Sequence, residues 1–347
     1  MEGEYRTIRL ASGMKKVQPQ GPIIINPTGD TPANYGPGKS RWILSPEYAG
    51  ILERICRARF EAHRLIPDLT DNWTEVEAQL PKIPENGDPI QLDEPDEIIA
   101  TLAQSVYAST KIEGEEVYAE DMPLAIVGDA HIRQKGQDDY DLRVIGTQDT
   151  YKAYIWALSQ SFPLAGGQTI SSQFICELHQ RMFSRTKPDT TGLLKKRPNQ
   201  IMMGNVIVMK MLEPDRVENL LNRLCDRLNS QFMIADNTGR YSKLLAIGEF
   251  IVDLLAIHPF DDGNGRIARL LSTYLLERAG FHFARFYSLD SVILDRHSEY
   301  YQCLLESQRV WYSSEEDLTP WINFYLSCVF SQWLRAYEEI QHRSAHK

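Results

Sequence analysis

The chain has 347 residues, of which 43% are hydrophobic and 24% are charged, which is the profile of a globular protein with one or two packed domains. Its net charge of −10 excludes the broad basic surface that nucleic-acid binding requires, although a few clustered arginines can still hold phosphate groups. The five cysteines form no C-x-x-C pair, so neither a zinc site nor a disulfide framework is predicted.

The sequence also lacks the marks of an exported or membrane-inserted protein. Its N-terminus has no apolar stretch of signal-peptide length, and no apolar run reaches the roughly 18 residues of a membrane-spanning helix. We therefore expect a cytoplasmic protein that has no membrane or nucleic-acid partner.

The N-terminal part of the chain divides at proline-rich stretches. The first 40 residues are dense in proline, glycine and asparagine, which predicts an irregular segment. A helix is expected to begin at Ser45-Pro46, because serine caps a helix and proline fits its first turn. The connector at residues 80–97 is the predicted internal boundary, and the helix that follows it is expected to end near Gly114.

Helical periodicity continues through the rest of the chain. The further predicted helices cover residues 143–160, 170–184, 214–229, 240–257, 264–279, 296–308 and 316–340. Only residues 193–211 look extended, with a β-branched run around Gly204-Asn205 that is typical of a hairpin. The sequence thus predicts a mainly α protein with one small β-hairpin, built from an N-terminal helical region (41–120) and a core with C-terminal helices (121–347).

One segment, residues 257–270, combines the groups needed for chemistry on a phosphate. Its sequence, IHPFDDGNGRIARL, places a proline and a glycine-rich loop before a helix whose free N–H groups favour an anion. Arg266 and Arg269 share one helix face and suit a polyphosphate. Asp262 offers an oxygen ligand for Mg²⁺ carried on the phosphates, and His258 offers a base that titrates near neutral pH.

Each of these features also has an ordinary structural interpretation. A lone histidine at a helix end usually packs against its neighbours, and an Asp-Asp-Gly-Asn-Gly sequence is usually a turn. A calcium loop is excluded by spacing, because the alternating acidic ligands and the distal glutamate are missing. Neither a dinucleotide-binding fingerprint nor a P-loop occurs in the sequence.

The same segment matches the Fic family signature H-P-F-x-[DE]-G-N-G-R-x-x-R at every fixed position, and the chain resembles that family over about residues 95–335. The resemblance implies a Fic-type helical bundle in which the hairpin is the family's flap. It also implies an enzyme, a protein adenylyltransferase that transfers AMP from ATP to a Ser, Thr or Tyr hydroxyl of a target protein and to itself. The target would dock on the flap, where an exposed edge strand could pair with an extended segment.

The resemblance assigns a role to each residue of the motif. His258 would accept the proton of the target hydroxyl, Asp262 would hold Mg²⁺ against the α- and β-phosphates, and Arg269 would bind the γ-phosphate. An anion nest and the first arginine would bind the other phosphate oxygens: Gly263, Asn264, Gly265 and Arg266. Tyr300 and Tyr301 resemble the adenine-side helix, with simple core packing as the alternative.

Two features limit what the resemblance implies. Many relatives have asparagine where Gln308 stands, so the adenine contact at that position is not carried over. A homodimer is compatible with the resemblance, since many relatives are dimers, but no motif in the chain requires it.

A second motif lies upstream at residues 109–114, STKIEG, and matches the family's inhibitory helix pattern [ST]-x-x-x-E-[GN]. Ser109, Glu113 and Gly114 occupy its fixed positions. Glu113 would pair with Arg269 and keep the nucleotide out, and breaking such a buried pair costs about 3–5 kcal/mol. The resemblance therefore implies autoinhibition, with the removal of AMP by water oriented on Glu113 as an additional hypothesis.

Other functions remain open at the level of sequence. A Fic-fold phosphotransferase that uses another nucleotide-type donor is the first alternative, and a non-catalytic nucleotide-sensing regulator is the second. The intact His258 and Asp262 favour an enzyme, because a pure binding protein needs no base. A DNA-binding regulator is disfavoured by the acidic balance of the chain.

Overall fold

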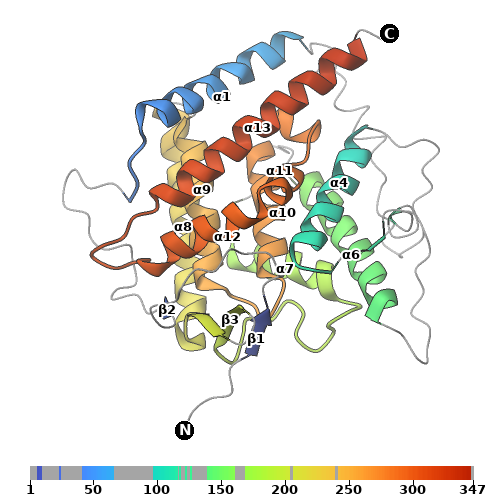
Figure 1. Ribbon diagram of the computed structural model, residues 1–347, viewed down its shortest axis with the longest axis vertical. Coiled ribbons are helices and arrows are strands. Elements are labelled where there is room, and N and C mark those ends of the chain that lie inside the picture. The colour runs from blue at the N-terminus through green and yellow to red at the C-terminus, as the bar shows by residue number, and fades with distance from the viewer. Residues whose placement is uncertain are drawn as a thin grey trace.

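The computed structural model is a bundle of helices with a small sheet at one end (Figure 1). It describes residues 6–9, 23–24, 41–65, 97–115, 117–118, 122, 126, 139–160, 169–203, 206–238 and 241–344. The helices are α1 (Pro46–Leu65), α4 (Glu97–Ile112), α6 (Asp139–Ser159), α7 (Ser172–Phe183), α8 (Pro214–Thr238), α9 (Tyr241–Ile257), α10 (Asn264–Arg278), the 3₁₀ turn η2 (His282–Arg285), α11 (Leu289–Asp295), α12 (His297–Arg309) and α13 (Thr319–Ser344). The strands are β1 (Arg6–Arg9), β2 (Ile23–Ile24), β3 (Asn199–Met203) and β4 (Val206–Lys210).

The core is built around α9 and α10, which pack against each other. α9 is apolar on nearly every face, as expected for a helix that is surrounded, and α8 and α13 lie against it. The long helix α13 crosses the bundle with α1 alongside it (Figure 1). On the other side, α4 packs on α6 and α11 and also reaches α10. This last contact brings the end of α4 to the first turn of α10.

The sheet has the strand order β1-β3-β4-β2. β3 and β4 form the predicted antiparallel hairpin, with a register shift between Ile201 and Met202. β1 pairs in parallel with β3, so that Arg6 lies opposite Asn199, and β2 pairs in parallel with β4. The sequence predicts an exposed edge on this hairpin, but β1 pairs with most of β3, and β2 pairs with the last two residues of β4.

The mainly α architecture with its hairpin confirms the predicted fold class. Two short elements escape the prediction, α11 and η2, because 7 and 4 residues are too few for a helical period to register. The first 40 residues, predicted to be irregular, contain β1 and β2. The predicted connector at 80–97 lies outside the described residues except for Glu97, as does the hairpin turn at Gly204-Asn205. The division of the chain near residues 40 and 120 stays a prediction.

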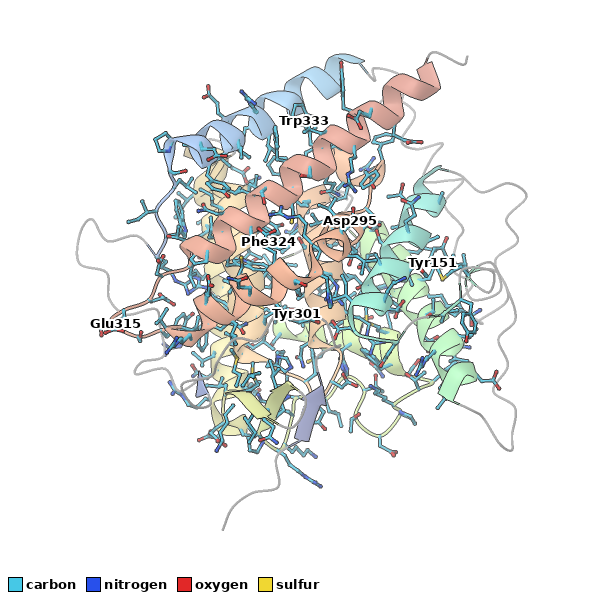
Figure 2. All side chains as sticks on the ribbon, viewed as in Figure 1. Tyr151, Asp295, Tyr301, Glu315, Phe324 and Trp333 are labelled. Atoms are coloured by element: carbon cyan, nitrogen blue, oxygen red, sulfur yellow. The ribbon has the colours of Figure 1, made fainter. Side chains whose placement is uncertain are left out.

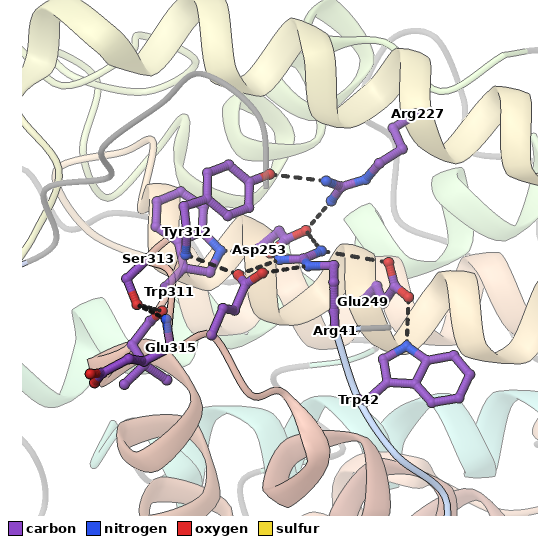
Figure 3. A network of polar contacts seen from close by, with 11 residues as sticks. Arg41, Trp42, Arg227, Glu249, Asp253, Trp311, Tyr312, Ser313 and Glu315 are labelled. Atoms are coloured by element: carbon purple, nitrogen blue, oxygen red, sulfur yellow. Dashed lines mark hydrogen bonds and ion pairs between the residues drawn. The ribbon is translucent and has the colours of Figure 1, made fainter. Parts of the chain in front are cut away.

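A buried cluster of charges anchors α9 (Figure 3). Asp253 is fully buried on this helix, and both of its oxygens accept hydrogen bonds from Arg41 at 2.7 Å. Arg227 of α8 also pairs with Asp253, and Trp311 donates to it at 2.6 Å. Burial alone would raise the pKa of Asp253, but the two arginines lower it below its usual value. The cluster ties α9 to α8 and to the N-terminal segment, which fixes the helix end that carries His258.

Among the described helices, none combines the length and the apolar character needed to cross a bilayer.

Candidate active site

His258 follows the last residue of α9, where Pro259 prevents the helix from continuing. Its backbone has φ +51°, a left-handed conformation that is uncommon outside glycine, and its N–H still bonds to the Leu254 carbonyl at 2.9 Å. The ring nitrogen Nδ1 lies 3.1 Å from the Leu255 carbonyl. Since a carbonyl only accepts, Nδ1 carries the proton and Nε2 keeps a free lone pair.

The protonation state of His258 follows from its surroundings. The side chain is 8% exposed, and burial together with the nearby charge of Lys195 lowers its pKa to about 3. The imidazole is therefore neutral at neutral pH, which is the state that a general base requires.

The loop after His258 is closed by Asn264. Its Oδ1 accepts from the Phe260 N–H and its Nδ2 donates to the Phe260 carbonyl, both at 2.9 Å. Gly263 adopts φ +79°, and a Cβ at this position would overlap the ring of Phe183. Glycine is therefore required here for two separate reasons. Both polar atoms of the Asn264 side chain bond to the Phe260 backbone in this structure. The contact of Asn264 with phosphate stays a prediction.

Asp262, the predicted metal ligand, lies in this loop directly before Gly263. Its Oδ1 accepts from the Gly263 N–H at 2.7 Å, and its Oδ2 forms an ion pair with Lys187. Burial alone would raise the pKa of this carboxyl, but Lys187 and Arg266 outweigh it and lower the pKa to about 2. Lys187 precedes the flap and was not predicted as part of the site.

The two arginines of the motif are buried on α10. Arg269 donates from Nη2 to Glu113 Oε1 at 2.7 Å and from Nε to Ser109 Oγ at 2.9 Å. Arg266 pairs with Glu115 at 2.7 Å and stacks on Phe183, 4.5 Å from the ring centre. Within the part of the chain that is described, Arg266 Nε and Arg269 Nη1 are buried donors without an acceptor. Such orphaned donors suit an anionic ligand.

Glu113 directly follows the last residue of α4, and Gly114 after it has φ +75°, which ends the helix. Its carboxylate lies over the first turn of α10, since a Cβ at Gly265 would collide with Glu113 Oε1. Free N–H groups and the positive end of the helix dipole meet at this position. The predicted pairing of Glu113 with Arg269 is thus present, and the carboxylate occupies the place where an anion is expected.

The two tyrosines predicted on the adenine side differ in position. Tyr300 is buried against Trp321 and Phe324, with ring centres 5.9 and 6.0 Å away. Tyr301 is partly exposed, and its hydroxyl donates to the Ile112 carbonyl at 3.4 Å; it lies on α12, and Figure 2 labels it. The Tyr300 ring packs on these aromatic residues while its hydroxyl interacts with Arg269, and the adenine-side position of both tyrosines stays a prediction.

His179 of α7 connects the motif to the start of the flap and was missed by sequence reasoning. Its ring stacks on Phe260 at 3.9 Å, its Nε2 donates to the Asp262 carbonyl at 3.1 Å, and its Nδ1 accepts from the Gly192 N–H at 2.9 Å. Burial lowers its pKa to about 4. A histidine inside an amphipathic helix gives no sequence signal for this role.

Asp290 is the second missed residue, and it lies on the short helix α11. Its Oδ1 is 3.4 Å from Arg269 Nε and accepts from the Tyr154 hydroxyl at 3.2 Å. Burial raises its pKa to about 6, although Arg269 opposes the rise. Asp290 therefore gives Arg269 a second counter-ion in addition to Glu113.

The metal expected from the sequence fits one kind of site only. Among the described residues, no group of three or more His, Cys, Asp or Glu side chains could hold a metal ion. The single carboxylate of Asp262 therefore suits an ion that takes its other ligands from phosphates and water, as Mg²⁺ commonly does.

The comparison with known families addresses this region directly. Residues 169–276 match the family model described as the Fic/DOC family. The chain carries a Fic/DOC domain. This domain includes the hairpin, α9 and the whole motif, whereas Glu113 precedes it and Asp290 follows it.

The Fic domain has relatives among curated proteins. The chain is 27% identical to the protein adenylyltransferase Fic of Nematostella vectensis over 281 residues, or 79% of this chain and 56% of that protein. It is 30% identical over 162 residues to the protein of the same name from Drosophila willistoni, or 46% of this chain and 28% of the relative. The chain thus spans less than two thirds of the length of either relative.

Solved structures share the Fic fold. A Fic family protein from Desulfovibrio desulfuricans G20 aligns with a TM-score of 0.60 at 20% identity, over 86% of this chain and 77% of that one. Fic-1 from C. elegans aligns with a TM-score of 0.54 at 18% identity, over 86% and 75% of the two chains. These similarities confirm the fold of the mainly helical bundle.

Proposed function

We propose that the Fic domain is a protein adenylyltransferase, which transfers AMP from ATP to a hydroxyl group of a protein. The observation that carries this proposal is the combination of two features in one segment. His258 is neutral and its Nε2 lone pair can accept a proton, and the helix that follows begins near two buried arginines with unused N–H donors. A base beside a helix N-terminus and two arginines suits transfer at phosphorus. The names of the curated relatives support the same reaction.

The reaction follows from the positions of these groups. The target hydroxyl gives its proton to His258 Nε2 while its oxygen attacks the α-phosphorus. The bond from this phosphorus to the oxygen bridging the β-phosphate breaks, and pyrophosphate leaves. Arg266 and Arg269 hold the β- and γ-phosphates from the N-terminal end of α10 and balance the charge that develops on the leaving group.

Asp262 is the residue that would hold Mg²⁺ in this reaction. When bound, the ion neutralises phosphate charge and aligns the leaving group. The depressed pKa of Asp262 supports this role, because the carboxylate is ionised and ready to bind a cation throughout the neutral range.

Glu113 acts as a built-in inhibitor of the reaction. Its carboxylate competes with the γ-phosphate for Arg269 and repels the nucleotide from the start of α10. Because Glu113 lies at the proposed phosphate site, we also keep the hypothesis that it orients a water molecule for the removal of AMP. A purified enzyme that released no AMP from a modified target with any divalent metal would rule that hypothesis out.

A protein target would dock at the flap, where β1 covers the edge of β3. Because β1 lies along β3, an extended target segment can pair with β3 only after β1 has moved away.

The test of the reaction uses the position of an isotope. The Glu113→Gly variant is incubated with ATP and cell lysate, with the label placed either on the α-phosphate or on the γ-phosphate. We expect protein to acquire the α-label at a rate at least about tenfold above wild type, and to acquire none in Glu113→Gly/His258→Ala. Transfer of the γ-label would instead identify a phosphotransferase, and no transfer of either label would favour a nucleotide-sensing regulator.

A further inference from the structure

Lys187 occupies a defined position on the metal-binding carboxylate of the proposed site. It lies just after α7, where its backbone N–H bonds to the Phe183 carbonyl at 2.8 Å and its own carbonyl accepts from the Thr191 N–H at 3.0 Å. Its ammonium pairs with Asp262 Oδ2 and lies 5.3 Å from the centre of the Phe183 ring. A turn and an aromatic platform therefore hold the charge in place.

The same platform serves the rest of the phosphate site. Phe183 is fully buried, faces Gly263 on the motif loop and supports the guanidinium of Arg266. Lys187 thus shares its aromatic platform with the motif loop and Arg266, and is part of the same group of contacts. Its side chain is 26% exposed and that of Asp262 is 36% exposed, so solvent and ions can reach the pair.

We propose that Lys187 is a built-in competitor of the divalent metal: its ammonium and Mg²⁺ share Asp262, so Lys187 sets the metal concentration at which nucleotide binds. This inference rests on the proposed function and adds a specificity-determining residue to it. Asp262 has one oxygen bonded to the Gly263 N–H, and its other oxygen is the one that carries Lys187. A metal ion that takes this oxygen must displace the ammonium.

The charge balance favours this exchange over simple addition. Arg266 already contributes positive charge nearby, because its guanidinium lies 4.5 Å from the centre of the Phe183 ring that also carries Lys187, with Glu115 as its ion-pair partner. A divalent ion added to Asp262 beside the Lys187 ammonium would meet repulsion from it, whereas the triphosphate brings negative charge that compensates for the metal and the arginines. Metal and nucleotide therefore enter together while Lys187 withdraws.

The experiment measures binding rather than turnover. A non-hydrolysable ATP analogue is titrated into the full chain by calorimetry over a series of MgCl₂ concentrations, in the Glu113→Gly background so that the inhibitory carboxylate is absent from every arm. We expect Lys187→Met to lower the half-saturating Mg²⁺ concentration about fivefold, the ratio appropriate to a partly exposed ion pair. Lys187→Gln is the second variant, and the same shift is expected of it.

Two matched variants complete the design. Lys187→Arg keeps the charge and should retain the parental midpoint, as should Lys196→Met, which removes an exposed lysine from the same connection to the flap. An unchanged half-saturating Mg²⁺ concentration in both Lys187→Met and Lys187→Gln would overturn the proposal. A higher concentration would overturn it as well, because it would mean that Lys187 supports phosphate binding. A chain that binds no nucleotide at any MgCl₂ concentration would refute the proposed function itself.

Discussion

At the residue scale, the motif residues divide their tasks between backbone and side chain. His258 combines a left-handed backbone with a ring whose Nδ1 is fixed by the Leu255 carbonyl, so its free nitrogen has one orientation. The two glycines allow other side chains to come close to the backbone: Phe183 contacts Gly263, and the Glu113 carboxylate contacts Gly265. The loop geometry thus depends on single atoms that a larger residue would displace.

Replacing Gly263 by alanine should destabilise the protein by about 2 kcal/mol or more. The added methyl group would meet the ring of Phe183 and the backbone would have to stay at φ +79°, so overpacking and left-handed strain add together. Urea unfolding of the variant against wild type measures this difference in the free energy of unfolding.

Gly50 provides the matched control for this substitution. It lies inside α1, and apart from its chain neighbours and the adjacent helix backbone no described atom comes within 4 Å of the methyl group that alanine would add, so Gly50→Ala should stabilise by about 0.5–1 kcal/mol. Equal effects of the two substitutions would contradict the role assigned to Gly263.

The sequence predicted the residues that act through a contiguous pattern and missed those that act through contacts distant in sequence. His258, Asp262 and the two arginines stand in one signature, and Glu113 stands in another. Asp290 reaches Arg269 from a helix of 7 residues that carries no readable period. Its role depends on tertiary packing, which a single sequence does not encode locally.

At the scale of elements, the site depends on three ends that meet: the C-terminal ends of α4 and α9 and the N-terminal end of α10. The helices themselves were predictable from apolar spacing, and the Glu113–Arg269 pair was predictable from family resemblance. The pairing of β1 with β3 was not predictable, because four residues in a proline- and glycine-rich segment carry no strand signal of their own.

Replacing Ile8 by proline should release β1 from the flap. Proline lacks the N–H group that a strand ladder needs, and Ile8 lies opposite Ile201 in the middle of the paired stretch. The amides of β3 should then exchange with solvent at least about tenfold faster, as measured by hydrogen–deuterium exchange with mass spectrometry.

Ile8→Val, which suits a strand, should leave that exchange unchanged. If β3 exchanged at the wild-type rate in the proline variant, β1 would not protect the flap, and a target could reach the edge of β3 directly.

At the scale of the whole molecule, the charges that shape the site also make stability depend on pH. The pKa values of His258 and His179 are lowered to about 3 and 4, so between pH 6.5 and 4 the unfolded chain binds protons that the folded chain refuses. Each histidine then removes up to about 1.4 kcal/mol per pH unit as the pH falls through this window. Asp290, whose pKa is raised to about 6, works in the opposite sense below pH 6 and offsets one of them.

We therefore expect a lower free energy of unfolding at pH 5 than at pH 7, measured by urea denaturation. His179→Gln removes one of the two histidine contributions and should flatten this dependence. A wild-type protein that was more stable at pH 5 than at pH 7, or a His179→Gln variant with an unchanged dependence, would show that other groups govern the response to acid.

The most direct test of the central claim is a crystal structure of the Glu113→Gly variant with Mg²⁺ and a non-hydrolysable ATP analogue. We predict the triphosphate at the N-terminal end of α10, the γ-phosphate on Arg269, and His258 Nε2 facing the α-phosphorus with space for an incoming hydroxyl. A triphosphate bound elsewhere, a reversed nucleotide that presents its γ-phosphorus to His258, or an imidazole enclosed by packed side chains would contradict the account.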